Sequence, residues 1–428
     1  MPKNKYGFHE FMPEEVWKWK SIETLVDSVL SLYDYEEIRL SVLQDYSVLR
    51  NGITALMDTE EADHVVKQVL NLCAPDHNIS LLSLRPEGTI SVLHHTASIF
   101  EDGDTHRVYY HGPMFRKDKN LHPMEFYQLG VELLGSDSIL SENEVISLGM
   151  QICHKLGMHG IRMEINSYGC EECRPAFFEA MRKYLTTHAD QYCKSCFDEL
   201  VANPLAKTKC IEDNCLHTTK QGPKIQEFLC DKCRLNFNRV KKIQANLGNH
   251  YHVNHHLFKN FSYYNETVFD FIIDVDGKPV VIGGGGRYDY LSAKITGKRI
   301  PAVGFYLNLD TIFDVLDKGT KFVRPRSKFS VYLCSQSSEL EIMMLQIAQE
   351  LHAHEIVTII SSDVWDANIE QANANRKNCS LMIMLRDENI REGKVLIRNL
   401  AKNYQDYVAL SNIVDEVLIA RKALQQHL

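Results

Sequence analysis

Four closely spaced cysteine pairs interrupt the chain between residues 170 and 233, and they constrain its fold more than any other feature. Two cysteines separated by two to four residues can fill two corners of a zinc tetrahedron. Eight such cysteines therefore predict two structural zinc sites of four thiolates each, although spacing does not say which pairs share an ion. Buried free thiols are the alternative, and four such pairs make that alternative improbable. The pairs are Cys170 and Cys173, Cys193 and Cys196, Cys210 and Cys215, and Cys230 and Cys233.

The cysteine-rich stretch divides a longer α/β pattern. Residues 1–165 alternate amphipathic helix and strand patterns, and residues 246–316 return to strand patterns that end in a glycine turn. Residues 166–245 are interrupted and cysteine-rich, so they are expected to be a zinc-binding insertion into one discontinuous core. The clearest expected elements are a helix at Glu14–Leu32 and strands at Glu36–Leu43, Val268–Val275 and Lys278–Gly283.

A second domain is expected at residues 329–428. The preceding stretch, Asp317–Lys328, is polar and basic with Gly and Pro, which is typical of a linker. Beyond it, strand and helix patterns alternate, which predicts a small α/β domain with a mostly parallel sheet. Its expected strands are Phe329–Cys334, Ile356–Ser361 and Ser380–Arg386, and its expected helix is Leu340–His354.

Composition excludes several classes of protein. The 428 residues are 44% hydrophobic and 24% charged, as in ordinary soluble proteins. No stretch approaches the roughly 18 apolar residues of a membrane span, and the first residues lack the apolar region of a secretory signal. A cytoplasmic protein is therefore expected, in which cysteines serve metals before disulfides. The net charge of −9 argues against avid nonspecific nucleic-acid binding but permits a shape-specific contact.

The segment LRPEGT, Leu84–Thr89, is the first candidate for chemistry. It joins an apolar strand to a helical pattern, with Pro86 expected early in the helix and Gly88 allowing close backbone approach. Glu87 would then lie at the edge of a cavity, where a carboxylate suits an ammonium group. An ordinary surface turn is the alternative for so short a stretch.

Residues Arg107–Gly135 read as a hairpin with a long polar loop. Arg116, in the segment MFRKD (Met114–Asp118), ends the first strand, while Gln128 and Glu132 share one face of the second. An arginine facing carboxylates across a hairpin could hold a phosphate beside an amine. Cross-strand salt bridges are the alternative.

Glycines before Arg287 and Tyr288, in GGGRYD (Gly284–Asp289), would let the backbone run close to a ligand, although hairpin turns use glycine too. The three segments together, in this order, resemble class II histidyl-tRNA synthetases. The likeness extends to the N-terminal stretch and to Leu385–Leu400 near the C-terminus.

The resemblance implies an α/β (α+β) fold. It consists of a class II synthetase-like antiparallel sheet with flanking helices, a Cys-rich insertion and a C-terminal α/β anticodon-binding-like domain. The catalytic core then comprises 1–165 and 246–316, and the anticodon-binding-like domain 329–428. A homodimer through the first-motif region is also implied, although Ser41 there takes the place of that motif's proline.

Residue roles follow from the same resemblance. Arg116 and Lys259 correspond to positions that act on the α-phosphate, and Arg116 and Asp118 to ATP-binding positions, with Mg²⁺ accompanying ATP if the protein is active. Carboxylates would hold the α-ammonium, while phenols and an amide would hold the imidazole. The implied histidine pocket consists of Glu87, Thr89, Gln128, Glu132, Tyr264 and Tyr288.

Departures from the family pattern cluster on phosphate chemistry. Thr311 stands where the third motif has an arginine, and Lys259 stands where an arginine normally bridges substrate and α-phosphate. Ser262 replaces an aspartate, and His122 falls near another phosphate-binding arginine. Loss of one preorganised donor typically costs ~10²–10³ in rate, and lysine lacks the planar fork of arginine. Ordinary activation is therefore expected to be weak or lost.

Three functions stay open from the sequence. The first is ATP-dependent activation of histidine and its transfer to tRNA, which the full domain set favours. The second is a non-catalytic histidine-binding regulator, similar to the regulatory subunit of ATP phosphoribosyltransferase. Lys259 and Thr311 favour this function and the third one alike. The third is an amino-acid ligase for a non-tRNA acceptor, or a tRNA-binding protein without catalysis.

Overall fold

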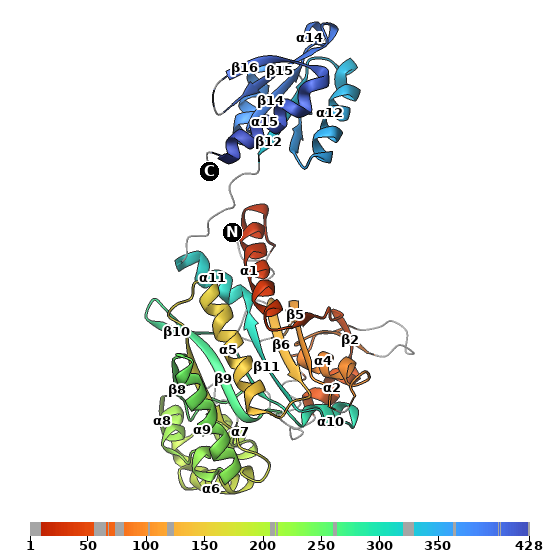
Figure 1. The fold of residues 1–428 in the computed structure, drawn as a ribbon. Coiled ribbons are helices and arrows are strands. Elements are labelled where there is room, and N and C mark those ends of the chain that lie inside the picture. Colours follow the sequence, from red (N-terminus) through yellow and green to blue (C-terminus); the bar gives the residue numbers. More distant parts are fainter. Residues whose placement is uncertain are drawn as a thin grey trace. The chain divides into compact units, whose positions relative to one another are not determined.

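Two compact units make up the chain, Met1–Phe322 and Val323–Leu428. Figure 1 shows the fold of each unit. The computed structural model describes residues 10–54, 66, 68–72, 81–101, 103–117, 124–205, 210, 213–259, 263–319, 329–362, 365–400, 402 and 404–426. Most of the predicted linker therefore lies outside the described residues, and the predicted domain boundaries stay predictions.

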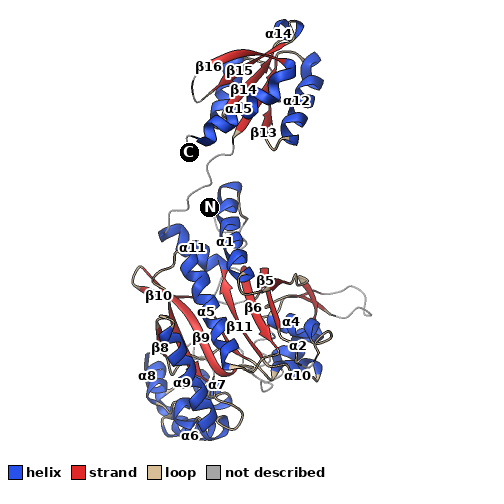
Figure 2. Cartoon of the chain, in the orientation of Figure 1, coloured by secondary structure: helices blue, strands red, loops and turns tan. Residues whose placement is uncertain are grey.

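The first unit is built on an eight-stranded sheet in the order β1-β5-β6-β11-β10-β9-β7-β8, whose strands are red in Figure 2. The six central strands pair antiparallel, and only the edge pairs β1–β5 and β7–β8 run parallel. The strands are β1 (Glu36–Glu37), β5 (His106–Phe115), β6 (Glu125–Leu134), β7 (Arg162–Ser167), β8 (Tyr251–Val253), β9 (Asn265–Val275), β10 (Lys278–Arg287) and β11 (Ala302–Asn308).

Each face of this sheet is covered by a different set of helices. Side chains alternate along a strand, so Leu129, Val131 and Leu133 of β6 face a core formed with α1, α5 and α11. Gln128 and Glu132 consequently face the opposite side, where α2, α4 and α10 pack. The helices are α1 (Pro13–Ser31), α2 (Tyr46–Thr54), α4 (Thr89–Thr96), α5 (Ile139–Lys155), α10 (Leu291–Thr296) and α11 (Leu309–Gly319).

The predicted strand Glu36–Leu43 is wrong beyond its first two residues. The chain passes at this point from the large sheet to a small sheet of β2 (Leu43–Asp45), β4 (Leu82–Leu84) and β3 (Asn71–Leu72). The guanidinium of Arg85 donates to the Leu40 carbonyl at 2.7 Å, and the Arg85 amide donates to the Val42 carbonyl at 3.0 Å. These bonds replace the ladder that a continuous strand would need.

The predicted glycine turn is also wrong, because Gly283–Gly286 lie inside β10 and pair with strands on both sides. A Cβ added to Gly285 would lie 2.0 Å from the Gly304 carbonyl oxygen. Glycine is required there by the close approach of neighbouring backbone rather than by a reversal of the chain.

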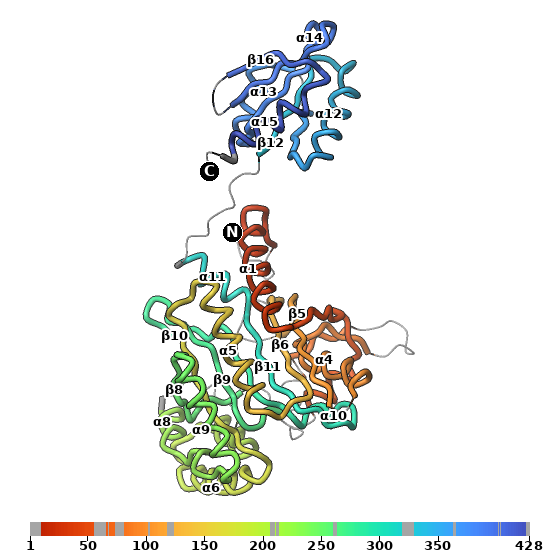
Figure 3. Tube along the Cα trace, in the orientation of Figure 1, coloured from red at the N-terminus to blue at the C-terminus, as the bar shows by residue number. Residues whose placement is uncertain are grey.

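The cysteine-rich insertion is a helical lobe, drawn in green tones in Figure 3, that leaves the sheet after β7 and returns before β8. The insertion contains no strand among the residues described, and the buried side chains of its helices, such as Phe177 and Met181, pack into the apolar cluster on the pocket face of the sheet. Its helices are α6 (Arg174–Thr187), η1 (Ala189–Gln191), α7 (Lys194–Ala202), α8 (Asp213–Gln221), η2 (Ile225–Phe228) and α9 (Asp231–Asn246).

The second unit contains a five-stranded sheet in the order β13-β12-β14-β15-β16. The predicted mostly parallel arrangement holds for the first three strands, but β15 and β16 run antiparallel. The connection from Leu385 to Lys394 is too short for a crossover, which needs about a dozen residues or more, so β15 returns antiparallel. The elements are β12 (Ser330–Ser335), η3 (Ser338–Leu340), α12 (Glu341–Ala353), β13 (Val357–Ile360), α13 (Ala367–Arg376), β14 (Leu381–Leu385), α14 (Asp387–Arg391), β15 (Lys394–Asn399), β16 (Tyr404–Ala409), η4 (Leu410–Asn412) and α15 (Ile413–Gln426).

Within the described part of the chain, no helix combines the length and apolar character that crossing a membrane requires.

Candidate ligand pocket and cysteine clusters

One pocket opens on the face of the large sheet opposite α5, with about 750 Å³ of empty space including its mouth. The structure brings eight of the nine predicted pocket and phosphate residues to its walls, and the ninth, Asp118, lies outside the described residues. The roles assigned to these residues stay predictions. The eight are Glu87, Thr89, Arg116, Gln128, Glu132, Lys259, Tyr264 and Tyr288.

Glu87 is held at the start of α4. Its carboxylate accepts the backbone amides of Thr89 at 2.8 Å and Ile90 at 2.9 Å, which are among the amides that a helix start leaves unpaired. The helix therefore begins at Thr89, and Pro86 precedes it instead of lying within its first turn. Burial raises the pKa of Glu87, and these amides and Arg116 oppose that rise.

Glu132 lies at the centre of the pocket wall on β6. One carboxylate oxygen accepts the hydroxyl of Thr89 at 2.8 Å, and the other accepts the hydroxyl of Tyr288. Gly304 makes room for this group, since a Cβ there would lie 1.8 Å from Oε2 of Glu132. Burial raises the pKa of Glu132 to about 8, and the charge of Glu87 adds to the effect. Burial thus favours the neutral form of Glu132, and a cation placed beside it would favour the ionised form.

Tyrosines form the other wall of the pocket. Tyr264 and Tyr288 are buried and meet edge to face at 6.4 Å between ring centroids, and Tyr263 contacts both rings. Gln128 donates to the hydroxyl of Tyr110 at 3.4 Å. Sequence reasoning did not single out Tyr110 or Tyr263, although Tyr263 is adjacent to a predicted residue.

The two cations of the pocket are both engaged by the protein. Nε of Arg116 donates to the Pro86 carbonyl at 2.7 Å, and its guanidinium lies 5.1 Å from the ring centroid of Phe126. Nζ of Lys259 donates to the Phe269 carbonyl at 2.5 Å and forms an ion pair with Asp270.

Asp270 was missed by sequence reasoning. Its side chain is 8% exposed and that of Lys259 is 9% exposed, so the pair is largely removed from water. The available signal was an aspartate between two phenylalanines in the apolar strand Val268–Val275, on the pocket face.

Thr311 is not among the residues that line the pocket. It lies in the first turn of α11, where its amide donates to Oδ1 of Asn308 at 2.9 Å. The neighbouring Asp310 accepts the backbone amide of Tyr127 at 2.5 Å. The position that the family gives to an arginine therefore carries no charge, and Ser262 and His122 lie outside the described residues.

Arg287 does not line the pocket but holds the adjacent end of β10 in place. Its guanidinium bonds Glu142 at 3.1 Å and Asp289 at 3.0 Å, and it also donates to the carbonyls of Ser136 and Ser138. This buried network fixes the end of β10, from which Tyr288 extends into the pocket.

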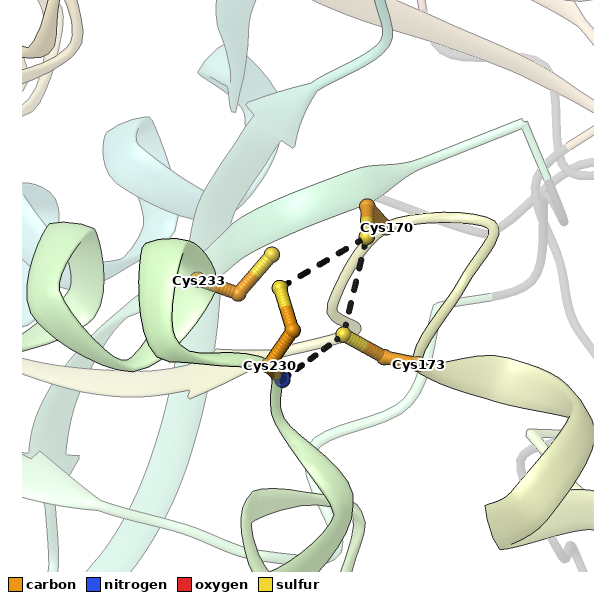
Figure 4. A group of neighbouring side chains, drawn as sticks. All are labelled: Cys170, Cys173, Cys230 and Cys233. Atoms are coloured by element: carbon orange, nitrogen blue, oxygen red, sulfur yellow. Dashed lines mark hydrogen bonds between the residues drawn. The ribbon is translucent and has the colours of Figure 1, made fainter.

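The cysteines form two four-thiol clusters, and the structure resolves which pairs combine. In each cluster all ligand atoms lie within 4.8 Å of one another. The first cluster consists of Cys170, Cys173, Cys230 and Cys233, and the second of Cys193, Cys196, Cys210 and Cys215. Figure 4 shows the first cluster, in which the side chains converge from a loop and from the starts of two helices.

The sulfur spacing fits a tetrahedral metal. Sγ of Cys170 lies 3.6 Å from Cys173 and 4.0 Å from Cys230, and Cys193 lies 3.9 Å from Cys210. A zinc ion with bonds of ~2.3 Å needs sulfur atoms roughly 3.8 Å apart, whereas a disulfide needs ~2.05 Å. The amides of Cys230 and Cys193 each donate to a sulfur of their own cluster at 3.2 Å, as expected around thiolate ligands.

Comparisons with known proteins agree with this architecture. The family model described as histidyl-tRNA synthetase matches residues 7–172 and 179–312. A histidine–tRNA ligase of Halothermothrix orenii is 30% identical over 417 residues, which cover 96% of this chain and 97% of the relative. A histidine–tRNA ligase of Moorella thermoacetica is 29% identical over 96% of each chain.

Solved structures show the same fold. The apo histidyl-tRNA synthetase of S. aureus superposes with a TM-score of 0.78 at 21% identity, covering 97% of this chain and all of that one. A Bacillus halodurans structure, titled as an ATP phosphoribosyltransferase regulatory subunit/histidyl-tRNA synthetase, has a TM-score of 0.62 at 19% identity. It covers 90% of this chain and 98% of its own. The class II synthetase fold predicted from the sequence is therefore confirmed.

Proposed function

Because the chain belongs to the histidyl-tRNA synthetase family, we propose that its pocket binds histidine and that ordinary activation of histidine by ATP, for transfer to tRNA, is weak or lost. The observation that carries this proposal is a contrast within one pocket. Its amino-acid residues are preorganised by hydrogen bonds to one another, while one of its two cations, Lys259, is paired with a carboxylate of the protein.

Histidine suits the charge of this pocket. Glu87, Glu132 and Asp270 are acidic lining residues, and Arg116 and Lys259 are the basic ones among the lining residues described. Burial deprives the carboxylates of Glu87 and Glu132 of hydration. The positive charge of an α-ammonium group beside them would compensate for that loss. The phenols of Tyr264 and Tyr288, with the amide of Gln128, offer hydrogen-bond partners to an imidazole.

Activation of histidine is expected to be weak because little positive charge is available to the phosphates of ATP. Formation of an adenylate by attack of a carboxylate on the α-phosphate of ATP depends on positive charge placed around that phosphate. Lys259 would have to leave Asp270 to serve this role, and Thr311 supplies no charge. Arg116 would be the principal contact to the phosphate if ATP and Mg²⁺ bind, and these cofactors matter only to an active protein.

Four further features belong to the same proposal. The two clusters of cysteines would hold structural zinc, which their spacing and thiol chemistry support. A homodimer and a cytoplasmic location are expected from the family. The match to histidine–tRNA ligases over almost the full chain supports tRNA as a partner.

The deciding experiment measures two quantities on the purified, zinc-loaded full chain. Isothermal calorimetry should show binding of L-histidine, and histidine-dependent exchange of pyrophosphate into ATP should be weak or absent. Robust exchange would overturn the proposed loss of activation. Absence of histidine binding would overturn the proposed ligand, with L-histidinol and L-glutamine as probes of whether another amine is preferred.

A histidine-binding regulator is the second candidate. The ion pair of Lys259 with Asp270 and the uncharged Thr311 favour it, because a regulator needs the amino-acid site without the phosphate site. Histidine binding without exchange, together with no charging of a histidine tRNA transcript, would support this candidate. Charging of the transcript would exclude it.

A further inference from the structure

The two cysteine clusters differ in their described connections to the pocket. Residues beside the first cluster hydrogen-bond to Lys259 and Tyr264, whereas Cys196 and Cys215 of the second cluster share only an apolar cluster with the pocket tyrosines. The first cluster closes the neck of the insertion, where the chain leaves β7 and enters α6. The second cluster lies further along the insertion, between α7 and α8. We propose that the metal of the first cluster positions the pocket segment around Lys259 and Tyr264, through Tyr168 and Arg174, so that amino-acid binding depends on this metal and not on the second one.

Tyr168 is the first connection. It lies two residues before Cys170 and is 1% exposed. Its hydroxyl accepts the backbone amide of Lys259 at 2.5 Å, and its ring contacts that of Phe258 at 6.0 Å between centroids. Phe258 and Lys259 both line the pocket. A displacement of Tyr168 would therefore move two residues of the pocket wall.

Arg174 is the second connection. It directly follows Cys173 at the start of α6, and one of its terminal nitrogens donates to the Tyr264 carbonyl at 2.5 Å. This bond joins the start of α6, and with it Cys173, to the backbone of the pocket segment.

The backbone between these side chains is clamped to the sheet. The amide of Tyr168 donates to the Glu266 carbonyl at 2.7 Å, and the amide of Glu266 donates to the Gly169 carbonyl at 3.0 Å. Gly169 has a φ of 60°, and a Cβ at this position would collide with Cβ of Cys173 at 2.6 Å. The cluster, Tyr168 and the start of β9 therefore form one continuous packed unit.

The hydrogen bonds described around Tyr192 and Thr219 stay within the insertion, whereas Lys220 at the end of α8 bonds through its backbone to His256. Thr219 donates to the hydroxyl of Tyr192 at 3.3 Å, and Tyr184 donates to the Thr218 carbonyl at 3.0 Å. Tyr192 directly precedes Cys193, so it offers a matched control for Tyr168: a buried tyrosine close to a cluster whose hydroxyl accepts a hydrogen bond.

The inference rests on the proposed histidine site, so its test has one arm that needs no ligand. Hydrogen–deuterium exchange is measured on the full chain with its zinc, on Tyr168→Phe and on Tyr192→Phe. Tyr168→Phe should speed exchange in peptides that contain Lys259 and residues 264–267, while Tyr192→Phe should leave those peptides unchanged. Equal protection at Lys259 in all three proteins would overturn the proposal.

The second arm measures L-histidine affinity and zinc content. Tyr168→Phe should keep two zinc ions and weaken histidine binding by about tenfold, the size expected for one buried hydrogen bond. Tyr192→Phe should bind like the parent protein. Unchanged affinity in Tyr168→Phe would overturn the proposal, whereas failure of the parent protein to bind histidine would overturn the proposed function and leave the exchange arm to decide this inference.

Metal-ligand variants complete the test. Cys173→Ser with Cys233→Ser should lose one zinc ion and expose the Lys259 peptides to exchange. Cys196→Ser with Cys215→Ser should also lose one zinc ion, but its faster exchange should fall in residues 193–221. The same exchange pattern from both pairs would show that the insertion acts as a single structural body and would contradict the proposal.

Discussion

The two ends of the pocket differ in how their charged side chains are bonded. At the amino-acid end, Glu132 accepts hydroxyls from Thr89 and Tyr288, and these bonds hold acceptors in place around a space. At the phosphate end, Lys259 is bonded to Asp270 and to a backbone carbonyl. The first arrangement preorganises groups for a ligand, while the second neutralises a charge within the protein. A charged residue can therefore line a pocket although its charge is neutralised by the protein and is not available to a ligand.

Removal of the central carboxylate should have the largest effect on this contrast. Glu132→Gln keeps the size of the side chain but cannot balance an ammonium charge, so histidine affinity should fall on the order of a hundredfold or more. Calorimetry measures the affinity, and thermal unfolding checks that the variant is folded. Near-parental affinity in a folded variant would show that the ligand's ammonium lies elsewhere.

Restoring charge at the other end should have the next largest effect. Lys259→Arg combined with Thr311→Arg should raise histidine-dependent ATP–pyrophosphate exchange by about 10- to 100-fold, since one preorganised donor is typically worth ~10²–10³ in rate and the two are not additive. Each single variant serves as a control. No gain in the double variant would place the main defect outside these two positions.

Changing pH should act on the amino-acid end alone. Burial raises the pKa of Glu132 to about 8 from 4.5, so the folded protein retains a proton that the unfolded chain releases at lower pH. The stability that this proton contributes is present below pH 4.5 and is lost as the pH rises through about 8. Binding of a cation requires the opposite, ionised form.

Histidine affinity should therefore weaken by about tenfold per pH unit below 8, and binding should release a proton. Calorimetry in two buffers of different ionisation enthalpy, at pH 7 to 9, measures the release. Glu132→Gln should bind without releasing that proton. Equal proton release in the variant would assign the titration to another group.

Freeing Lys259 should have the smallest effect. Asp270→Asn removes its ion-pair partner and one negative charge from the pocket, so ATP should bind about fivefold more tightly. Asp274→Asn is the matched control on the same strand, because that carboxylate pairs with Arg162 and is 57% exposed. A similar gain in both variants would indicate a general charge effect instead of release of Lys259.

The sequence predicted which residues lie together in the pocket better than it predicted the secondary structure of the segments that carry them. Glu87, Glu132 and Tyr288 come together from three segments, as the family resemblance implied. The turn at Gly283–Gly286 was wrong because a glycine run permits both a reversal and a crowded strand, and only the neighbouring strands decide between them.

Other features depended on contacts that one segment cannot reveal. Cysteine spacing limits each pair to one metal, but the combination of Cys170 with Cys230 depends on where α6 and α9 begin in space. Asp270 was read as one residue of an apolar strand because its importance depends on Lys259, whose side chain reaches it across the pocket.

The closure of the insertion at its neck has a consequence for how such a chain can change. Sγ of Cys170 and Sγ of Cys230 lie 4.0 Å apart although sixty positions separate them in the chain. Once the two ends are joined there, the length of the loop between them has little effect on the stability of the core. Doubling the length of a flexible loop raises the free-energy cost of closing it by only ~0.6 kcal/mol. The insertion could thus change in length between its helices while β7 and β9 keep their register, provided that Phe177 and Ile225 remain to pack beside Tyr264.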